Sequence, residues 1–180
     1  MSIEEIQHIN KARVGDSNSF TFLVKKYQQL AYNLAFRIVC DEDNAKDVVQ
    51  ESFIKIWKNM KRYDSKVKFS TWMYTIVTNT AIDYLRSAKK RTMISIDNLG
   101  EKLSNTNMEN ELENKELSQL IRVASDSLTT KQRLVFVLCD LQGLKTDEVG
   151  EILKLSANSI KSNLYHARNN IREKIQHLIT

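Results

Sequence analysis

The feature that most constrains this chain is that it contains almost no residue that breaks a helix. Its 180 residues include no proline and only four glycines. Through most of the chain, apolar side chains recur every three or four positions, which is the period of an amphipathic α-helix. The sequence therefore predicts an all-α fold.

Composition narrows the class of protein further. With 42% hydrophobic and 27% charged residues the chain is typical of a globular protein, and no apolar run approaches the length of a membrane span. The N-terminus has no pattern of a secretion signal. Cys40 and Cys139 lie far apart without a metal-binding or redox motif, so we expect buried free thiols in a reducing compartment, the cytoplasm. The three histidines are isolated, so neither a metal site, a cofactor nor a catalytic triad is predicted.

The positions of helix-capping residues and of one acidic segment predict two helical domains joined by a flexible acidic linker. We expect helices over residues 2–13, 17–39, 43–60, 70–91, 112–128 and 130–141, followed by a helix pair in the tail. Asp16 or Ser17, Ser70 and the Thr129-x-x-Gln132 capping box are the expected helix starts. Residues 92–110 are rich in acids and asparagines with little apolar period, which indicates a linker between domains 1–91 and 111–180.

The tail has the pattern of a helix-turn-helix. In its first helix Val149, Ile152 and Leu153 form one apolar stripe, and Ser156 is placed to cap the second helix. The outer face of that second helix is polar and basic; it carries Asn158, Ser159, Lys161, Ser162, Tyr165, His166, Arg168 and Arg172. Such a face offers donors to phosphates and base edges, which favours DNA binding. The alternative is an ordinary solvent-exposed helix face, which would have the same residue pattern.

Two further surfaces stand out in the first domain. Asp47, Gln50 and Glu51 surround Ile54 on the polar side of the third helix, which suggests a docking surface, the alternative being one scattered exposed hydrophobe. Between Lys55 and Arg91 basic residues are opposed only by Asp64 and Asp83, and aromatic residues lie among them. That combination is typical of a groove for single-stranded or partly melted nucleic acid.

The aromatic residues of this basic segment fall into two groups. Trp57 and Trp72 lie on apolar stripes, so we expect them in the core. Tyr63 and Tyr74 fall off the stripes, which makes them the better candidates to meet a ligand.

Three blocks together resemble the extracytoplasmic-function (ECF) sigma factors of bacterial RNA polymerase: residues 43–57, residues 69–86, and the tail. The resemblance implies that Asp47, Gln50, Glu51 and Ile54 bind the β′ subunit of core polymerase, with β as a further contact. It implies that the loop from Tyr63 to Phe69 captures a flipped base and that the next helix reads and melts the promoter −10 element. The −10 set is Lys61, Arg62, Tyr63, Lys66, Lys68, Tyr74, Asn79, Asp83 and Arg86.

For the tail the resemblance implies reading of the −35 element through the outer face of its second helix. It also implies promoter DNA and an anti-sigma factor as partners and no catalytic activity. The chain departs from the family at the turn, where Lys154 replaces the usual glycine, and at Gly150, where alanine is usual and a looser helix is expected.

Two other classes of function remain as alternatives. A stand-alone helix-turn-helix regulator would bind a palindromic duplex site without polymerase. An enzyme acting on nucleic acid would need clustered carboxylates or a metal motif, and Asp64 and Asp83 have no such partners in the sequence.

Overall fold

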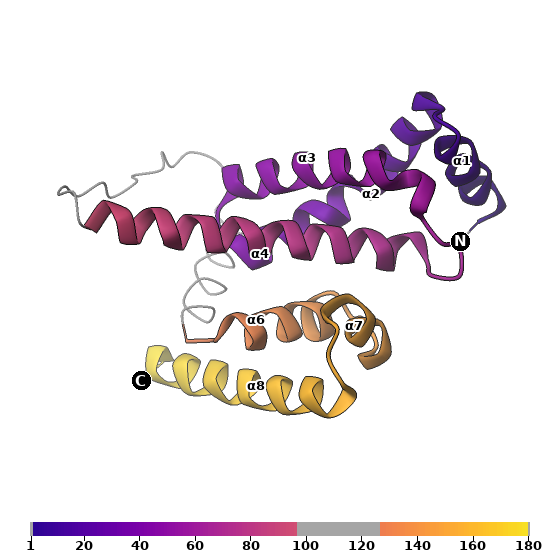
Figure 1. Ribbon diagram of the computed structural model, residues 1–180. Helices are drawn as coiled ribbons and strands as arrows, with labels where there is room; N and C mark the ends of the chain where they lie inside the picture. Colours follow the sequence, from indigo (N-terminus) through magenta and orange to yellow (C-terminus); the bar gives the residue numbers. More distant parts are fainter. Residues whose placement is uncertain (1, 97–126, 180) are drawn as a thin grey trace.

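The computed structural model describes residues 2–96 and 127–179, with side chains described for 2–88 and 127–176 (Figure 1). Within these ranges every regular element is a helix, and the helices form two bundles, which confirms the predicted two-domain all-α fold. No helix in the described ranges is long and apolar enough to cross a membrane.

The N-terminal bundle contains α1 (Ile3–Arg13), α2 (Ser17–Val39), α3 (Glu42–Asn59), the short 3-10 helix η1 (Met60–Arg62) and α4 (Phe69–Ile96). Side-chain caps start the first three: Ser2 on α1, Asp16 on α2 and Asp41 on α3, each accepting a bond from the amide three residues on. Residues with positive φ separate these helices, Gly15 (φ 99°) after α1 and Cys40 (φ 57°) after α2.

The core of this bundle lies where α2, α3 and α4 pack together. Leu23, Leu34, Ile56, Met73 and Val77 are all fully buried there. Helix α1 is held on α2 by a buried carboxylate, Glu5, which accepts a hydrogen bond from the Tyr27 hydroxyl and pairs with Lys26 Nζ at 2.8 Å.

The C-terminal bundle contains α6 (Thr130–Phe136), the π-helical segment η2 (Val137–Leu141), α7 (Thr146–Leu153) and α8 (Ala157–Ile179). The predicted capping box is present: Gln132 N donates to Thr129 Oγ1 at 3.3 Å, and Thr129 N donates to Gln132 Oε1 at 3.0 Å. Helices α7 and α8 form a helix-turn-helix whose second helix starts at the predicted Ser156 cap, with Ser159 N donating to Ser156 Oγ at 3.3 Å.

The turn of the helix-turn-helix contains Lys154, and Gly150 packs against it from α7. Lys154 takes the left-handed conformation (φ 55°) that glycine adopts without cost. A Cβ on Gly150 would come within 3.1 Å of the carbonyl oxygen of Leu155. Gly150 therefore lets the turn close tightly against α7, which the expectation of a merely looser helix did not include.

Two predicted boundaries are wrong. Helix α4 begins at Phe69, so Ser70 lies inside it and is not its cap, and α4 continues to Ile96, through residues 92–96 that were assigned to the linker. Residues 92–96 contain none of the acids, asparagines or glycine that begin at Asp97, so nothing in their sequence ends the helix. The rest of the predicted linker, 97–110, and nearly all of the helix predicted over 112–128 lie outside the described residues.

The two bundles are in contact along α4 and the C-terminal end of α2. Helix α4 packs on α7, and α2 meets η2 (Figure 1). Three polar contacts cross this boundary: Arg37 Nη1 donates to the Leu141 carbonyl oxygen at 2.6 Å, Arg133 Nη1 donates to the Ile38 carbonyl oxygen at 3.3 Å, and Lys68 Nζ pairs with Glu148 Oε1 at 3.2 Å.

Candidate functional sites

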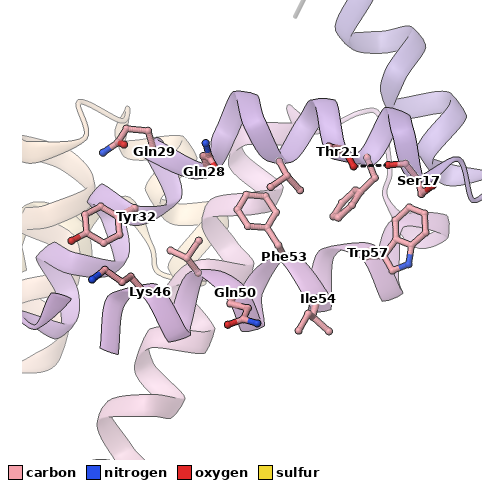
Figure 2. A pocket seen from close by; sticks show the side chains of 13 residues that line it. Ser17, Thr21, Gln28, Gln29, Tyr32, Lys46, Gln50, Phe53, Ile54 and Trp57 are labelled. Carbon is pink, nitrogen blue, oxygen red and sulfur yellow. Dashed lines mark hydrogen bonds between the residues drawn. The ribbon is translucent and has the colours of Figure 1, made fainter. Parts of the chain in front are cut away.

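A groove runs between α2 and α3 on the N-terminal bundle. Its volume is about 780 Å³, and Figure 2 shows side chains of both helices converging on it. Its floor is apolar, with Phe20 stacked at a tilt on Trp57 (ring centroids 4.8 Å apart) and meeting Phe53 edge-on (6.4 Å). Ile54 and Trp57 remain 46% and 36% exposed at its edge. An apolar cleft with amide side chains at its rim suits the apolar face of a partner helix.

The residues predicted for docking lie at this groove or beside it. Asp47, Gln50, Glu51 and Ile54 are all exposed on α3, and Gln50 and Ile54 line the groove itself. Glu51 forms an ion pair with Lys55 at 2.8 Å. The predicted residues thus lie on the α3 side of the groove, and their docking role stays a prediction.

The α2 side of the groove and Trp57 were missed. The expectation that Trp57 belongs to the core is wrong, because its side chain packs on Phe20 of α2 and still remains 36% exposed. Phe20, Val24 and Tyr32 complete the lining from α2. A signal was present in the sequence, since Trp57 follows the exposed Ile54 by three positions and so lies on the same helix face.

The residues predicted to meet the −10 element lie in η1, the following loop and α4. Seven of them are exposed, namely Lys61, Arg62, Lys66, Lys68, Asn79, Asp83 and Arg86. Asp83 and Arg86 form a loose ion pair at 3.8 Å, and Lys68 is engaged with Glu148 across the bundle boundary. The basic surface is thus largely open, apart from Lys68.

Tyr63 and Tyr74, expected off the buried stripes, are buried at 1% and 6% exposure, so that expectation is wrong. The loop after η1 folds back on itself, and the Tyr63 hydroxyl donates to the Val67 carbonyl oxygen while its ring packs on Phe69 and Trp72 at 5.6 and 5.0 Å. Burial raises the pKa of both phenols. Tyr63 therefore stabilises the folded-back loop from its buried side. Trp72 is half-buried and is the more accessible aromatic ring of this cluster.

Tyr74 lies close to the boundary between the bundles. Besides burial, the charges of Arg37 and Glu148 act on its pKa, the first lowering it and the second raising it. These two side chains are the same ones that carry the contacts of α2 and α7 across the boundary. Tyr74 is thus within electrostatic range of charged groups from both bundles.

The face of α8 predicted to meet the −35 element points away from the C-terminal core. Asn158, Lys161, Ser162, Tyr165, His166, Arg168 and Arg172 are exposed and Ser159 is half-buried. Tyr165, at 63% exposure, is the most prominent apolar ring on the surface of this helix. Ile160 and Ala167 are buried on the opposite face and fix the orientation of the helix.

Arg168 differs from the rest of this face because its charge has a partner within the chain. Its Nε and Nη2 atoms donate to the two carboxylate oxygens of Asp140 at 2.8 and 2.7 Å. That bidentate bond raises the pKa of Arg168 and ties α8 to η2. Arg168 therefore anchors the helix in addition to presenting an edge to solvent.

In the ranges described, no group of three or more His, Cys, Asp or Glu side chains could hold a metal ion. Cys40 and Cys139 are both half-buried, and neither takes part in a disulfide in the described part of the chain.

Comparison with known proteins identifies the family of the chain. The Sigma-70 region 2 family model matches residues 23–91, and the Sigma-70 region 4 model matches residues 118–171. The ECF RNA polymerase sigma-E factor of Haemophilus influenzae is 31% identical, with 95% of each chain covered. The ECF RNA polymerase sigma factor SigW of Bacillus subtilis is 30% identical over 96% of this chain and 97% of its own.

Solved structures share the fold. CnrH, determined in complex with the cytosolic domain of CnrY, matches with a TM-score of 0.74 at 20% identity, covering 97% of this chain and 98% of its own. The sigma factor RpoE of Bartonella quintana, determined with the anti-sigma factor NepR, matches with a TM-score of 0.70 at 20% identity over 87% of this chain and 96% of its own.

Models of both sigma-70 regions thus match this chain, and the two ECF relatives match over 95% or more of both chains. The chain belongs to the ECF RNA polymerase sigma factors, which direct promoter-specific transcription initiation.

Proposed function

We propose that the groove between α2 and α3 is where this sigma factor binds core RNA polymerase, through the coiled coil of the β′ subunit. The observation that carries the proposal is the exposed apolar pair Ile54 and Trp57 beside a cleft of about 780 Å³. A helix of the partner covers such a pair and removes it from water, which is favourable in proportion to the apolar area buried. Asp47, Gln50 and Glu51 supply a polar rim that orients the partner.

The domain spanning residues 1–91 then reads and melts the −10 element. Unstacking bases costs a few kcal/mol per step. The exposed cations Lys61, Arg62 and Lys66 offset part of that cost by contacts to phosphates, and stacking of a base on an aromatic ring contributes about 1–3 kcal/mol. Trp72, half-exposed above the buried Tyr63, is the ring best placed for this stacking.

The domain spanning residues 111–180 anchors the duplex upstream at the −35 element. The N-terminal half of α8 presents Asn158, Lys161, Ser162 and Tyr165 as exposed donors, which fits insertion of a recognition helix into the major groove. Each domain alone is too small to bind a promoter tightly. Joining both on polymerase raises the effective concentration of the second site once the first is bound.

The chemistry of RNA synthesis stays with polymerase, so the sigma factor itself is no enzyme, and it acts in the cytoplasm. An anti-sigma factor is the further partner that we propose. Support comes from CnrH and RpoE, whose structures were determined with CnrY and with the anti-sigma factor NepR.

The test is reconstitution with core polymerase. Core enzyme plus this protein is expected to start run-off transcripts on a subset of fragments from the source genome, and core enzyme alone is not. At sub-saturating sigma factor, Gln50→Ala with Ile54→Gln is expected to lower that activity by at least about fivefold. The helical circular dichroism should stay unchanged, because both side chains are exposed. Tight duplex binding by the sigma factor alone, with no polymerase-dependent transcript on any fragment, would refute the proposal.

A further inference from the structure

The loop between η1 and α4, residues 63–68, is closed on itself by hydrogen bonds among its own residues. The Tyr63 hydroxyl donates to the Val67 carbonyl oxygen, and Val67 N donates to the Asp64 carbonyl oxygen at 3.2 Å. The Asp64 carboxylate accepts a bond from Lys66 N at 3.0 Å, which makes an Asx-turn. Two side chains, Tyr63 and Asp64, thus hold the backbone of the loop from within.

The surface formed by this loop and the start of α4 carries groups that the proposed function assigns to DNA. Lys66 is exposed in the loop, Arg62 is exposed just before it, and Trp72 is half-buried in the first turn of α4. The centroids of the Trp72 and Tyr63 rings are 5.0 Å apart. A base that stacks on Trp72 therefore meets a loop that is already folded, so little binding energy is lost in ordering it.

Asp64 acts on this surface in two opposite ways. It is exposed among cations, and its negative charge repels DNA phosphates. If charge were its only contribution, the surface would bind DNA more tightly without it. Its carboxylate also fixes the turn through the Lys66 amide. Substitutions separate the two effects, because asparagine loses the charge but keeps an acceptor oxygen, whereas alanine loses both.

We propose that the Tyr63 hydroxyl and the Asp64 carboxylate are positioning groups that fold this loop, before DNA arrives, into the shape that receives one unstacked base of the promoter. This inference rests on the proposed function, since it describes how the −10 surface is made ready. Tyr63 acts through the Val67 carbonyl and Asp64 through the Lys66 amide, so neither has to touch the DNA. Loss of either bond lets the loop take other shapes, and the apparent affinity then falls with the fraction of molecules that hold the correct one.

The folding of the loop is tested by hydrogen exchange of single amides in the free, full-length protein. Tyr63→Phe keeps the ring and removes only the hydroxyl, so the Val67 amide should exchange about two- to tenfold faster, the range for one hydrogen bond. Asp64→Ala should do the same to the Lys66 amide, and Asp64→Asn should not. The Asn44 amide, which donates to a carboxylate at 2.9 Å at the start of α3, is the reference. Unchanged exchange of Val67 and Lys66 in these variants would overturn the proposal.

The consequence for DNA is tested with core polymerase carrying the sigma factor and a fluorescein-labelled single strand. The strand is the non-template −10 region of a promoter found by run-off transcription. Tyr63→Phe and Asp64→Ala should each weaken binding of the strand by about two- to tenfold. Asp64→Asn should bind at least as tightly as the wild type, because it keeps the turn and loses the repelling charge.

Tyr27→Phe is the matched control for loss of a buried phenol hydroxyl. Tyr27 donates to Glu5 and not to the loop, and its ring stays in place in the variant. Tyr27→Phe should therefore lower stability in urea while leaving the affinity for the strand unchanged. Equal weakening by Tyr27→Phe and Tyr63→Phe would assign the effect to stability and overturn the proposal.

An abasic scan of the strand gives a readout that a general loss of stability would not move. At the position whose base the loop receives, removal of the base should make Tyr63→Phe and the wild type bind alike. A Tyr63→Phe defect of the same size at every position would refute the positioning role, as would Asp64→Ala binding more tightly than the wild type.

Two outcomes separate this inference from the proposed function. If Tyr63→Phe and Asp64→Ala bind the strand as the wild type does, the inference is wrong and the proposed function stands. If the wild type with core polymerase neither transcribes nor binds such a strand, the proposed function is wrong, and the inference falls with it.

Discussion

Trp57→Ala gives the sharpest test of the groove, because Trp57 is the largest exposed apolar side chain there. About a third of its surface (36%) is open to solvent, and the rest packs on Phe20 at 4.8 Å between ring centroids. A partner helix seated in the groove would cover the open part. Truncation therefore removes contact area from the complex that the free protein does not use.

The expected loss follows from that area. A tryptophan side chain buries up to about 250 Å², so its exposed third corresponds to roughly 90 Å². At about 25 cal/mol per Å² this amounts to ~2 kcal/mol, or roughly 30- to 40-fold in the dissociation constant for core polymerase. Ile54→Gln, which loses a smaller exposed surface, should cost about 1 kcal/mol, or roughly fivefold.

The assay is a titration of labelled sigma factor with core polymerase, paired with urea unfolding of each variant. Trp57→Ala also loses packing on Phe20 and is expected to be destabilised by about 2 kcal/mol, whereas Ile54→Gln should unfold like the wild type. Ile3→Ala is the control, since Ile3 is 79% exposed on α1, away from the groove. Unchanged polymerase affinity for both Trp57→Ala and Ile54→Gln would remove the groove from the polymerase interface.

Two further predictions concern stability. Lys154→Gly should stabilise the protein against urea by about 0.5–1 kcal/mol, because relief of the left-handed backbone strain exceeds the added freedom of glycine in the unfolded chain; destabilisation would contradict this account of the turn. Glu5→Gln should cost about 1–2 kcal/mol at pH 7. Burial alone would raise the pKa of Glu5, but its bonds with Lys26 and Tyr27 outweigh burial and hold the pKa below the usual 4.5. This stabilisation is therefore present above pH 4.5 and is lost as pH falls through the lower pKa of Glu5 in the folded protein. The urea unfolding curves of Glu5→Gln and the wild type should therefore converge in acid. A difference in unfolding free energy that persists there would contradict this account.

Helix starts could be predicted from the sequence because capping is local. Asp16, Thr129 and Ser156 each bond an amide three residues away, so the residue type and spacing suffice to place them. The failure at Ser70 has the same origin, since a serine near an apolar stripe resembles a cap whether or not its hydroxyl is used. Helix existence and order were thus predictable, and α4 was misplaced by one residue at its start and five at its end.

The burial of aromatic residues could not be predicted in the same way. A helical period identifies a stripe but not which edge of it a neighbouring helix covers, so Trp57 was assigned to the core and Tyr74 to the surface. Tyr63 is buried because its loop folds back, and Tyr74 lies near groups from both bundles. The Arg168–Asp140 bond joins residues 28 positions apart, so a local sequence pattern cannot predict it either. Each of these depends on tertiary contact.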